Sequence, residues 1–239
     1  MADQSNIRNQ LLARLSAEDF SVIGPKLEPV ELRRSFEMAA FDQEVEYCYF
    51  IDSGIGSVIA VSPEQQKAEV GIVGREGLSP IAPVLGLQSA PYEYFMQVSG
   101  HGHRIKVSHL QQAMAESPHI LEVFLRYAQV LSIQASYTAL SNAIHHIDER
   151  LARWILMCDD RADNGTIALT HEFLSIMLAV RRPSVTTALH VLEGNGFIYS
   201  DRGLLTVRNR SALEAFAGDA YGIPEQAYRN AFGEAIGAR

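Results

Sequence analysis

The sequence has few of the residues that mark secreted, membrane-bound or metal-dependent proteins. Only two of its 239 residues are cysteine, Cys48 and Cys158, and both stand in apolar surroundings. Such thiols fit reduced, packed side chains, and they are too few to hold an iron–sulfur cluster alone. No apolar run approaches the roughly 18 residues of a membrane span, and the first residues show no signal-peptide pattern. We therefore expect a cytoplasmic protein with no membrane partner.

Catalytic and cofactor motifs are also missing. The sequence contains no G-x-S-x-G, H-E-x-x-H or G-x-G-x-x-G segment. No motif therefore supports a hydrolase with a serine nucleophile, a zinc protease or a dinucleotide-binding protein. Two histidine pairs, His101 with His103 and His145 with His146, are interpreted as solvated polar residues rather than metal ligands. We expect no enzyme activity, no cofactor and no metal.

Composition points to two domains. A chain of this length that is 47% hydrophobic can bury a substantial core. The net charge of −8 argues against a protein that coats nucleic acid non-specifically. It does not exclude a specific DNA-binding protein whose positive charge gathers on one face.

The first part of the chain, residues 1–117, is expected to be a β domain preceded by a helical arm. Short apolar runs separated by turn residues at regular spacing predict an antiparallel barrel or sandwich. These runs lie at 47–51, 57–61, 68–73, 92–98 and 103–107. A Gly/Pro-rich insert at 74–86 lies between two of them.

A long helix is predicted over residues 118–142, about 37 Å at ~1.5 Å per residue. Two apolar stripes run along it, and two apolar faces suggest two partners: the β domain and a second copy of the same helix. The stripes are Ile120, Phe124, Tyr127 and Leu131, and then Leu121, Leu125, Ala128, Ser132 and Ala135. The pattern lapses at 143–147, which predicts a hinge there. Residues 118–146 are therefore expected to form a dimerisation helix with its hinge, and residues 147–239 a third region.

Residues 169–208 predict two helices joined by a short turn, followed by a hairpin. Thr170 is suited to cap the first helix. Pro183 suits the start of the second, where Val185, Leu189 and Leu192 form the apolar stripe. The opposite face carries Ser184, Thr186, Thr187 and His190, with Arg181 and Arg182 at its entrance and no acidic residue.

This layout of a short polar helix with an arginine pair, followed by a basic-tipped hairpin, is typical of a winged helix-turn-helix. Between residues 170 and 210, five arginines stand against three acidic residues, which gives 5 − 3 = +2. The predicted DNA contacts are Thr170, Arg181, Arg182, Ser184, Thr186, Thr187 and Arg202. The alternative is that the two helices form a helical hairpin in an all-α core, but this leaves the acid-free face unexplained. For Arg202, the alternative is an ordinary charged residue in a hairpin turn.

Taken together, these segments resemble the Crp/Fnr family of bacterial transcription regulators over roughly residues 28–210. The resemblance is most specific in ERLARW at 149–154, LTHEFL at 169–174 and VRRPSVT at 180–186. It implies an α+β chain: an antiparallel β-roll like a cyclic-nucleotide-binding domain, a dimerisation helix, and a C-terminal winged helix-turn-helix. The implied protein is a homodimer that binds a palindromic double-stranded DNA operator, with RNA polymerase as a candidate partner.

The sequence departs from the effector-binding branches of that family. Where cyclic-nucleotide-binding members have an arginine for the phosphate, this sequence has Gln88-Ser89, and neutral Gln cannot supply the charge-assisted contact. Residues 1–47 contain no cysteine, so oxygen sensing through a cluster is excluded. The resemblance places the pocket for an unknown small-molecule effector at Gly74, Glu76, Gly77, Leu78, Gln88 and Ser89.

The DNA-reading helix also departs from the family pattern. Arg182 matches the first of three usual base-contacting positions, whereas Pro183 and Thr187 replace the other two. The operator is therefore expected to differ from the family's. Ala179 stands where a turn glycine is usual, and a positive φ there would cost about 1 kcal/mol. The alternative function is that of a β-roll sensor whose helical domain binds a protein partner instead of DNA.

Overall fold

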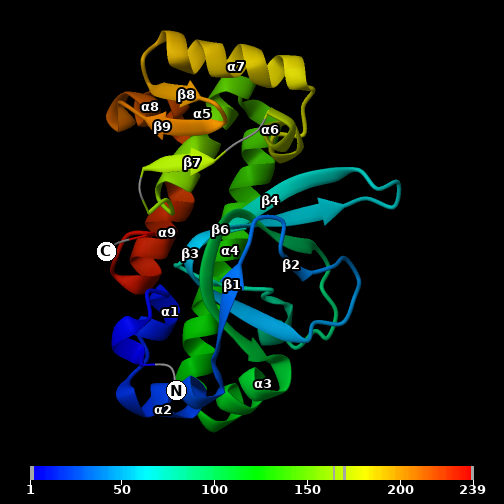
Figure 1. The fold of residues 1–239 in the computed structure, drawn as a ribbon, viewed down its shortest axis with the longest axis vertical. Coiled ribbons are helices and arrows are strands. Elements are labelled where there is room, and N and C mark those ends of the chain that lie inside the picture. The colour runs from blue at the N-terminus through cyan, green and yellow to red at the C-terminus, as the bar shows by residue number, and fades with distance from the viewer. Residues whose placement is uncertain (1–2, 164, 169–170, 238–239) are drawn as a thin grey trace.

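Two compact halves are joined by one long helix in the computed structural model (Figure 1). The structure describes residues 3–163, 165–168 and 171–237, without the side chains of His171 and Glu172. Thr170, one of the predicted DNA contacts, lies outside the described residues. Within them, no helix is long and apolar enough to cross a membrane.

The N-terminal half is the expected antiparallel β-roll. Its central pair is β3 with β6, and the sheet order is β1-β6-β3-β4, with β2 paired to β6 and β5 to β3. The strands are β1 Glu28–Leu32, β2 Glu37–Ala39, β3 Tyr47–Val61, β4 Lys67–Val73, β5 Leu78–Ser79 and β6 Glu93–Lys106. Long strands curl this sheet around a core that includes Phe50, Ile51 and Phe124. The predicted roll is confirmed.

Helices flank the roll. At the bottom of Figure 1 lie α1 Gln10–Ala13 and α2 Ala17–Ile23 of the N-terminal arm, together with α3 Val107–Glu116, and α4 Pro118–Ile144 runs upward from there. Ser117 begins α4, because its hydroxyl accepts a hydrogen bond from the backbone N–H of Ile120 at 3.3 Å and Pro118 needs no donor partner. The long helix runs two residues further than its predicted end.

The C-terminal half begins after a break of two residues, His145 and His146. It contains α5 Ile147–Asp159, β7 Thr166–Ala168, α6 His171–Met177, α7 Arg182–Gly194, β8 Ile198–Asp201, β9 Leu204–Val207, α8 Arg210–Ala217 and α9 Ile223–Phe232. The predicted hairpin is β8 with β9, and β7 adds a third strand on the outer edge of β9, which the sequence pattern did not indicate.

The chain's last helix returns to the first half. Helix α9 lies along α4, where Tyr228 and Ile236 pack with Val130 (Figure 1). Beyond α9, the residues up to Gly237 contact the N-terminal arm. Gln10 there accepts hydrogen bonds from the Tyr228 hydroxyl and the Gly237 backbone N–H, both at 3.2 Å. The two ends of the chain therefore close on one another.

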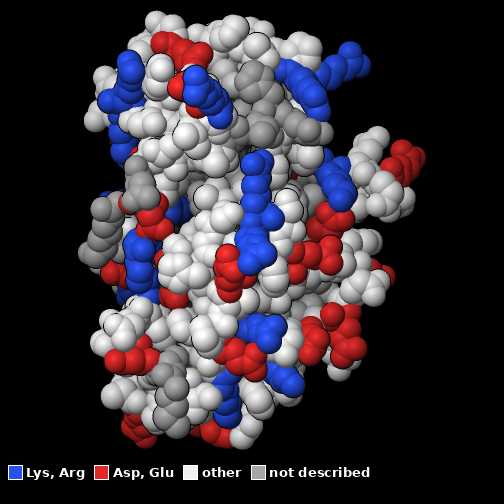
Figure 2. Space-filling view, viewed as in Figure 1, with Lys and Arg blue, Asp and Glu red and all other residues white. Residues whose placement is uncertain are grey.

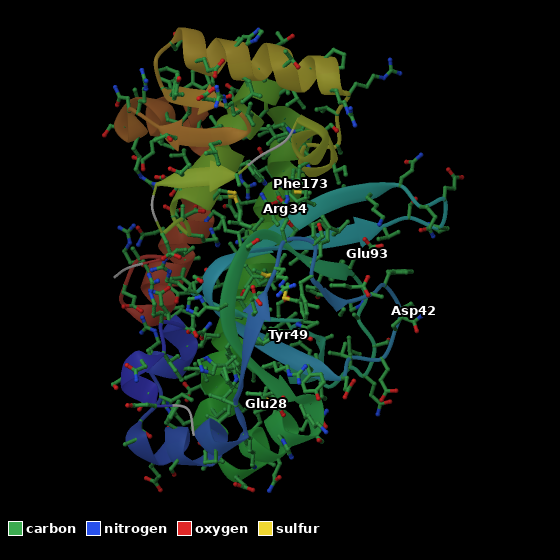
Figure 3. The ribbon with its side chains drawn as sticks, in the orientation of Figure 1. Glu28, Arg34, Asp42, Tyr49, Glu93 and Phe173 are labelled. Carbon is green, nitrogen blue, oxygen red and sulfur yellow. The ribbon has the colours of Figure 1, made fainter. Side chains whose placement is uncertain are left out.

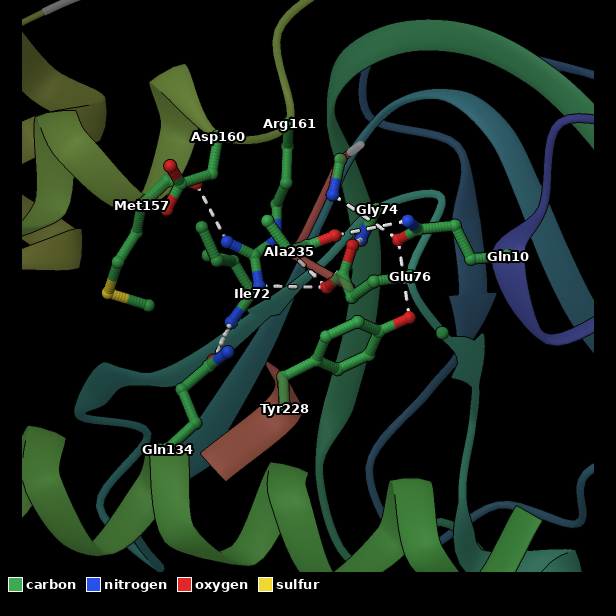
Figure 4. A network of polar contacts seen from close by, with 12 residues as sticks. Gln10, Ile72, Gly74, Glu76, Gln134, Met157, Asp160, Arg161, Tyr228 and Ala235 are labelled. Atoms are coloured by element: carbon green, nitrogen blue, oxygen red, sulfur yellow. Dashed lines mark hydrogen bonds and ion pairs between the residues drawn. The ribbon is translucent and has the colours of Figure 1, made fainter. Parts of the chain in front are cut away.

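A buried ion pair joins the two halves (Figure 4). Arg161, just after α5, is fully buried and lies 2.8 Å from the carboxylate of Glu76 in the roll. The same carboxylate accepts the backbone N–H of Gly74, and Arg161 donates to the carbonyl of Met157 at 2.7 Å. Burial alone would lower the pKa of Arg161, but the Glu76, Asp160 and Glu225 carboxylates raise it above its ordinary value. The guanidinium therefore stays charged in the interior.

A second buried contact crosses the same interface. The Trp154 indole N–H of α5 donates to Glu69 of β4 at 2.6 Å, and the other Glu69 carboxylate oxygen is buried without a hydrogen-bond partner in the described part of the chain. Burial raises the pKa of Glu69 to about 8, more than the Trp154 and arginine contacts lower it. An aromatic contact also joins the halves, because Phe173 of α6 packs against Phe95 of the roll with 5.8 Å between ring centroids. The Arg34 guanidinium lies over the Phe173 ring (Figure 3).

The turn between α6 and α7 contains a strained residue. Ala179 has φ of +49°, as its place in the turn predicts. An L-residue with a Cβ is disfavoured in this left-handed region, whereas glycine is not. The turn is closed by Arg150, whose guanidinium donates to the carbonyl of Leu178.

Ala179→Gly should raise the free energy of unfolding by up to about 1 kcal/mol, because relief of the left-handed strain exceeds the added freedom of the unfolded chain. Urea denaturation followed by tryptophan fluorescence measures it. The matched control is Ala215→Gly in α8, where right-handed helix makes glycine cost about 1 kcal/mol. A loss of stability at both positions would contradict the assignment of strain.

Glu69→Gln should flatten the pH dependence of stability between about pH 6.5 and pH 8.5. The folded-state pKa of Glu69 is raised from 4.5 to about 8, so the folded protein holds a proton that the unfolded chain releases, and stability falls as pH rises through that window. Asp160, whose pKa burial raises to about 6, is already ionised there. The native protein should lose at least ~1 kcal/mol in urea denaturation across the window.

The control for this prediction is Glu93→Gln, whose carboxylate pairs with Lys67 at the surface. That variant should keep the native slope. Equal slopes for Glu69→Gln and the native protein would mean that Glu69 is ionised in the folded state.

Candidate DNA-binding interface and effector cavity

Helix α7 lies at one end of the molecule, at the top of Figure 1. Its apolar stripe is the predicted one, with Val185, Leu189 and Leu192 buried against α5 and α6. Because an α-helix turns about 100° per residue, burying this stripe directs the opposite face outward. Arg181 is the N-cap and Pro183 stands in the first turn, where its missing N–H costs nothing.

The outward face of α7 carries the predicted polar residues. Arg181, Arg182 and Thr187 are exposed, and Ser184 and Thr186 are half-buried. Figure 2 shows basic side chains projecting at the end of the molecule where α7 begins. Arginine at the start of such a helix can reach phosphates or the O6 and N7 acceptors of guanine.

Both threonines on this face bond to their own helix. The Thr186 hydroxyl donates to the Arg182 carbonyl at 3.2 Å, and the Thr187 hydroxyl donates to the Pro183 carbonyl at 3.1 Å. A hydroxyl that donates inward keeps its lone pairs as acceptors. The face therefore combines arginine donors with hydroxyl acceptors and methyl groups.

The wing lies beside α7 and places a further arginine at its tip. Arg202 and Gly203 both have positive φ, +49° and +80°, which is the two-residue turn that matches the twist of a hairpin. Arg202 is exposed. At the base of the wing, Arg208 stacks on Tyr199 at 4.4 Å, an arrangement that the strand pattern did not predict.

The acidic residue nearest the end of α7 is turned away from its outward face. Glu193 accepts the backbone N–H of Ser200 at 3.1 Å, which ties helix to wing. Arg210 is likewise engaged, with Asp159 at 2.6 Å and Asp160 at 2.7 Å. Arg210 therefore holds α8 to α5, whereas Arg181 and Arg202 point to solvent.

A separate apolar cavity of about 240 Å³ opens between the roll and α4. Aliphatic and tyrosine side chains of the roll face small residues of the helix, and no charged side chain takes part. Its lining is Val58, Val70, Gly71, Ile81, Leu85, Tyr92, Tyr94, Ala128, Leu131, Ser132 and Ala135. The buried hydroxyl of Tyr94 has no hydrogen-bond partner in the described chain.

None of the six residues expected to form an effector pocket lines this cavity. Glu76 is committed to Arg161, and Leu78 is fully buried in the core. A Cβ on Gly77 would lie 2.1 Å from the Tyr127 ring, so Gly77 is a close-packing position.

The remaining three members of the set are also elsewhere. The Gly74 N–H bonds Glu76 within the interface between the halves. Gln88 and Ser89 are exposed on a surface loop, where Ser89 pairs with Glu44. The expected effector pocket stays a prediction, and the apolar cavity lies elsewhere, between β-strands and α4. Its helix wall is the small-residue stripe Ala128, Ser132 and Ala135, which the sequence indicated only as a partner face.

Comparison with protein-family models gives one match, a Crp-like helix-turn-helix domain over residues 149–216. The match spans α5 to α8, so it covers α7 and the wing. Among curated proteins, none matches the sequence.

Solved structures share the fold of most of the chain at low sequence identity. FixK2 from Bradyrhizobium japonicum has a TM-score of 0.67 and 18% identity, covering 80% of this chain and 98% of that one. A Crp/Fnr-family regulator from Thermus thermophilus has a TM-score of 0.62, 17% identity, and coverage of 80% and 98%. The c-di-GMP-responsive global regulator CLP of Xanthomonas campestris has a TM-score of 0.64, 13% identity, and coverage of 80% and 99%.

These likenesses agree with the geometry of α7 and the wing, and they do not favour the alternative of a helical domain that binds protein. Residues 149–216 thus form a Crp-like helix-turn-helix domain, a DNA-binding unit, and the chain shares the fold of these solved Crp/Fnr-family regulators.

Proposed function

We propose that two copies of this chain bind a palindromic operator, with one α7 from each copy in successive major grooves. The observation that carries this proposal is the acid-free, outward face of α7. It is joined by an apolar stripe on α4 that is exposed at Leu125 and half-buried at Leu121 and Ala128. Half-site centres would lie about 34 Å apart, one turn of DNA. The proposed DNA contacts are Arg181, Arg182, Ser184, Thr186, Thr187 and Arg202. Thr170, which the sequence predicts as a DNA contact, stays in this set.

The seam is the second stripe of α4. Leu121, Leu125, Ala128, Ser132 and Ala135 recur at alternating spacings of four and three, the repeat of a coiled-coil partner face. In the single chain this stripe is exposed or half-buried, with Leu125 42% exposed, while Ile120, Phe124 and Tyr127 of the first stripe are buried in the roll. Residues 118–142 would thus pair two chains.

The cavity between roll and helix offers a route from a signal to the seam, since Ala128, Ser132 and Ala135 belong to both. Its lining has no arginine, lysine or histidine, so it suits an uncharged ligand and not a cyclic phosphate. An uncharged apolar effector bound there would touch the dimer helix directly. RNA polymerase remains a candidate partner of the DNA-bound dimer, and the function requires no catalytic step.

Arg182→Ala should weaken operator binding by about 1–3 kcal/mol and relax the preference at one base pair, because arginine to guanine is the commonest base contact. Genomic footprinting of the tagged protein would identify a site, and mobility shifts on that site would measure affinity. The control is Arg33→Ala in the roll, whose side chain is 79% exposed. Unchanged affinity and base preference in Arg182→Ala would exclude this contact.

Leu125→Glu should convert the protein to monomers and lower operator affinity, because facing carboxylates on the seam repel each other and lose apolar burial. Light scattering after size exclusion measures the mass. Gln111→Glu on the exposed face of α3 adds the same charge away from the seam and should stay dimeric. A native protein that is a stable monomer would overturn the palindrome as well as the seam.

A further inference from the structure

A second cavity, of about 460 Å³, lies far from α7, where three distant segments of the chain meet. The N-terminal arm forms one wall, the turn after β4 supplies another, and the segment after α9 closes the third. Its lining is Ile7, Arg8, Gln10, Ala13, Arg14, Arg75 and Glu234. The volume lies in the range of small-molecule sites.

Three arginines and a single carboxylate make this lining strongly basic. Arg75 is only 3% exposed, so its guanidinium is fixed in place by the packing around it. Arg8 and Arg75 both pair with Asp163, which follows α5, with Arg8 at 2.6 Å. Arg14 pairs with Glu234, which also accepts from the Gln10 amide at 3.1 Å. Two carboxylates therefore already lie where three guanidinium groups converge.

These carboxylates do not satisfy the arginines. The Nε–H groups of Arg14 and Arg75 are both buried without a hydrogen-bond partner in the described chain. A buried donor left unpaired loses the hydration it had in water, and the loss is greater when the group is charged. Phosphate oxygens are more numerous than those of a carboxylate, and they match the guanidinium fork in a bidentate manner. The site is built for an anion that offers more acceptors than Glu234.

We propose that this cavity binds a small multivalent phosphate-bearing anion, which displaces Glu234 from Arg14 and engages Arg8 and Arg75 from the same side. Glu234 is 39% exposed and lies on the segment after α9, so it can leave without disturbing the core. Its departure removes two of the contacts that hold the C-terminal segment to the N-terminal arm, those of Glu234 with Arg14 and Gln10, and leaves the Gln10 bonds to Tyr228 and Gly237. The anion therefore loosens the segment that ties α9 and the DNA-binding half to the sensor half.

Calorimetric titration of the full-length protein with sodium pyrophosphate, at ionic strength held constant with sodium chloride, tests the proposal. Saturable binding is expected, and Arg8→Gln and Arg14→Gln should each weaken it about tenfold, through loss of charge-assisted contacts. Glu234→Gln should tighten it about threefold or more, because the competing carboxylate is gone. Arg33→Gln, an exposed arginine paired with Glu31, is the matched control and should bind as the native protein does.

Hydrogen exchange supplies the second measurement. Amides in residues 223–237 should exchange faster with pyrophosphate present, and those in β3 should not change. The absence of saturable binding in both the native protein and Glu234→Gln, or equal binding in the Arg8 and Arg14 variants, would overturn the site. Binding without faster exchange would overturn the loosening.

Because no DNA is present in these measurements, a failed pyrophosphate titration leaves the operator proposal standing. Loss of operator binding by Arg182→Ala likewise leaves the anion site unaffected. The two proposals therefore fail separately.

Discussion

The position of the DNA-reading helix depends on one buried charge pair. Arg161 and Glu76 lie 85 residues apart in the chain, and each would be a buried, uncompensated charge without the other. Removing one partner of such a pair is far more damaging than the pair's net contribution suggests, often by about 3–5 kcal/mol. The two halves therefore have a strong electrostatic reason to meet in a single arrangement, in which Trp154 also reaches Glu69.

That arrangement determines what each surface can do. It leaves the outward face of α7 and the wing in solvent at one end of the molecule, and it leaves the Leu125 seam of α4 uncovered along its side. The roll and α9 occupy the other faces of α4. A ligand between roll and helix would act on the seam, whereas an anion between the N-terminal arm and the C-terminal segment would act on α9. One long helix would thus receive two chemically distinct inputs.

Local chemistry made much of this fold predictable from the sequence. Apolar periodicity indicated α4 and the buried stripe of α7, turn residues indicated the roll, and the turn position of Ala179 indicated its positive φ. Pairing between distant segments was not predictable. The ion pair of Glu76 could not be seen in the sequence, because its partner Arg161 is 85 positions away, and Glu76 was therefore interpreted as a pocket residue. Similarly, no sequence pattern near Arg8 or Arg75 reveals that both side chains pair with Asp163. For the same reason, the sequence did not indicate the apolar cavity between the roll and α4.

The meeting of Gln10 with Tyr228 and Gly237 has a consequence for how the protein is made. A ribosome releases the N-terminal arm more than two hundred residues before Tyr228 and Gly237, so the arm cannot complete this packing while the intervening chain is being made. The β-roll half therefore completes its packing only after the C-terminal half has emerged. A chain terminated before Tyr228 would lack this closure.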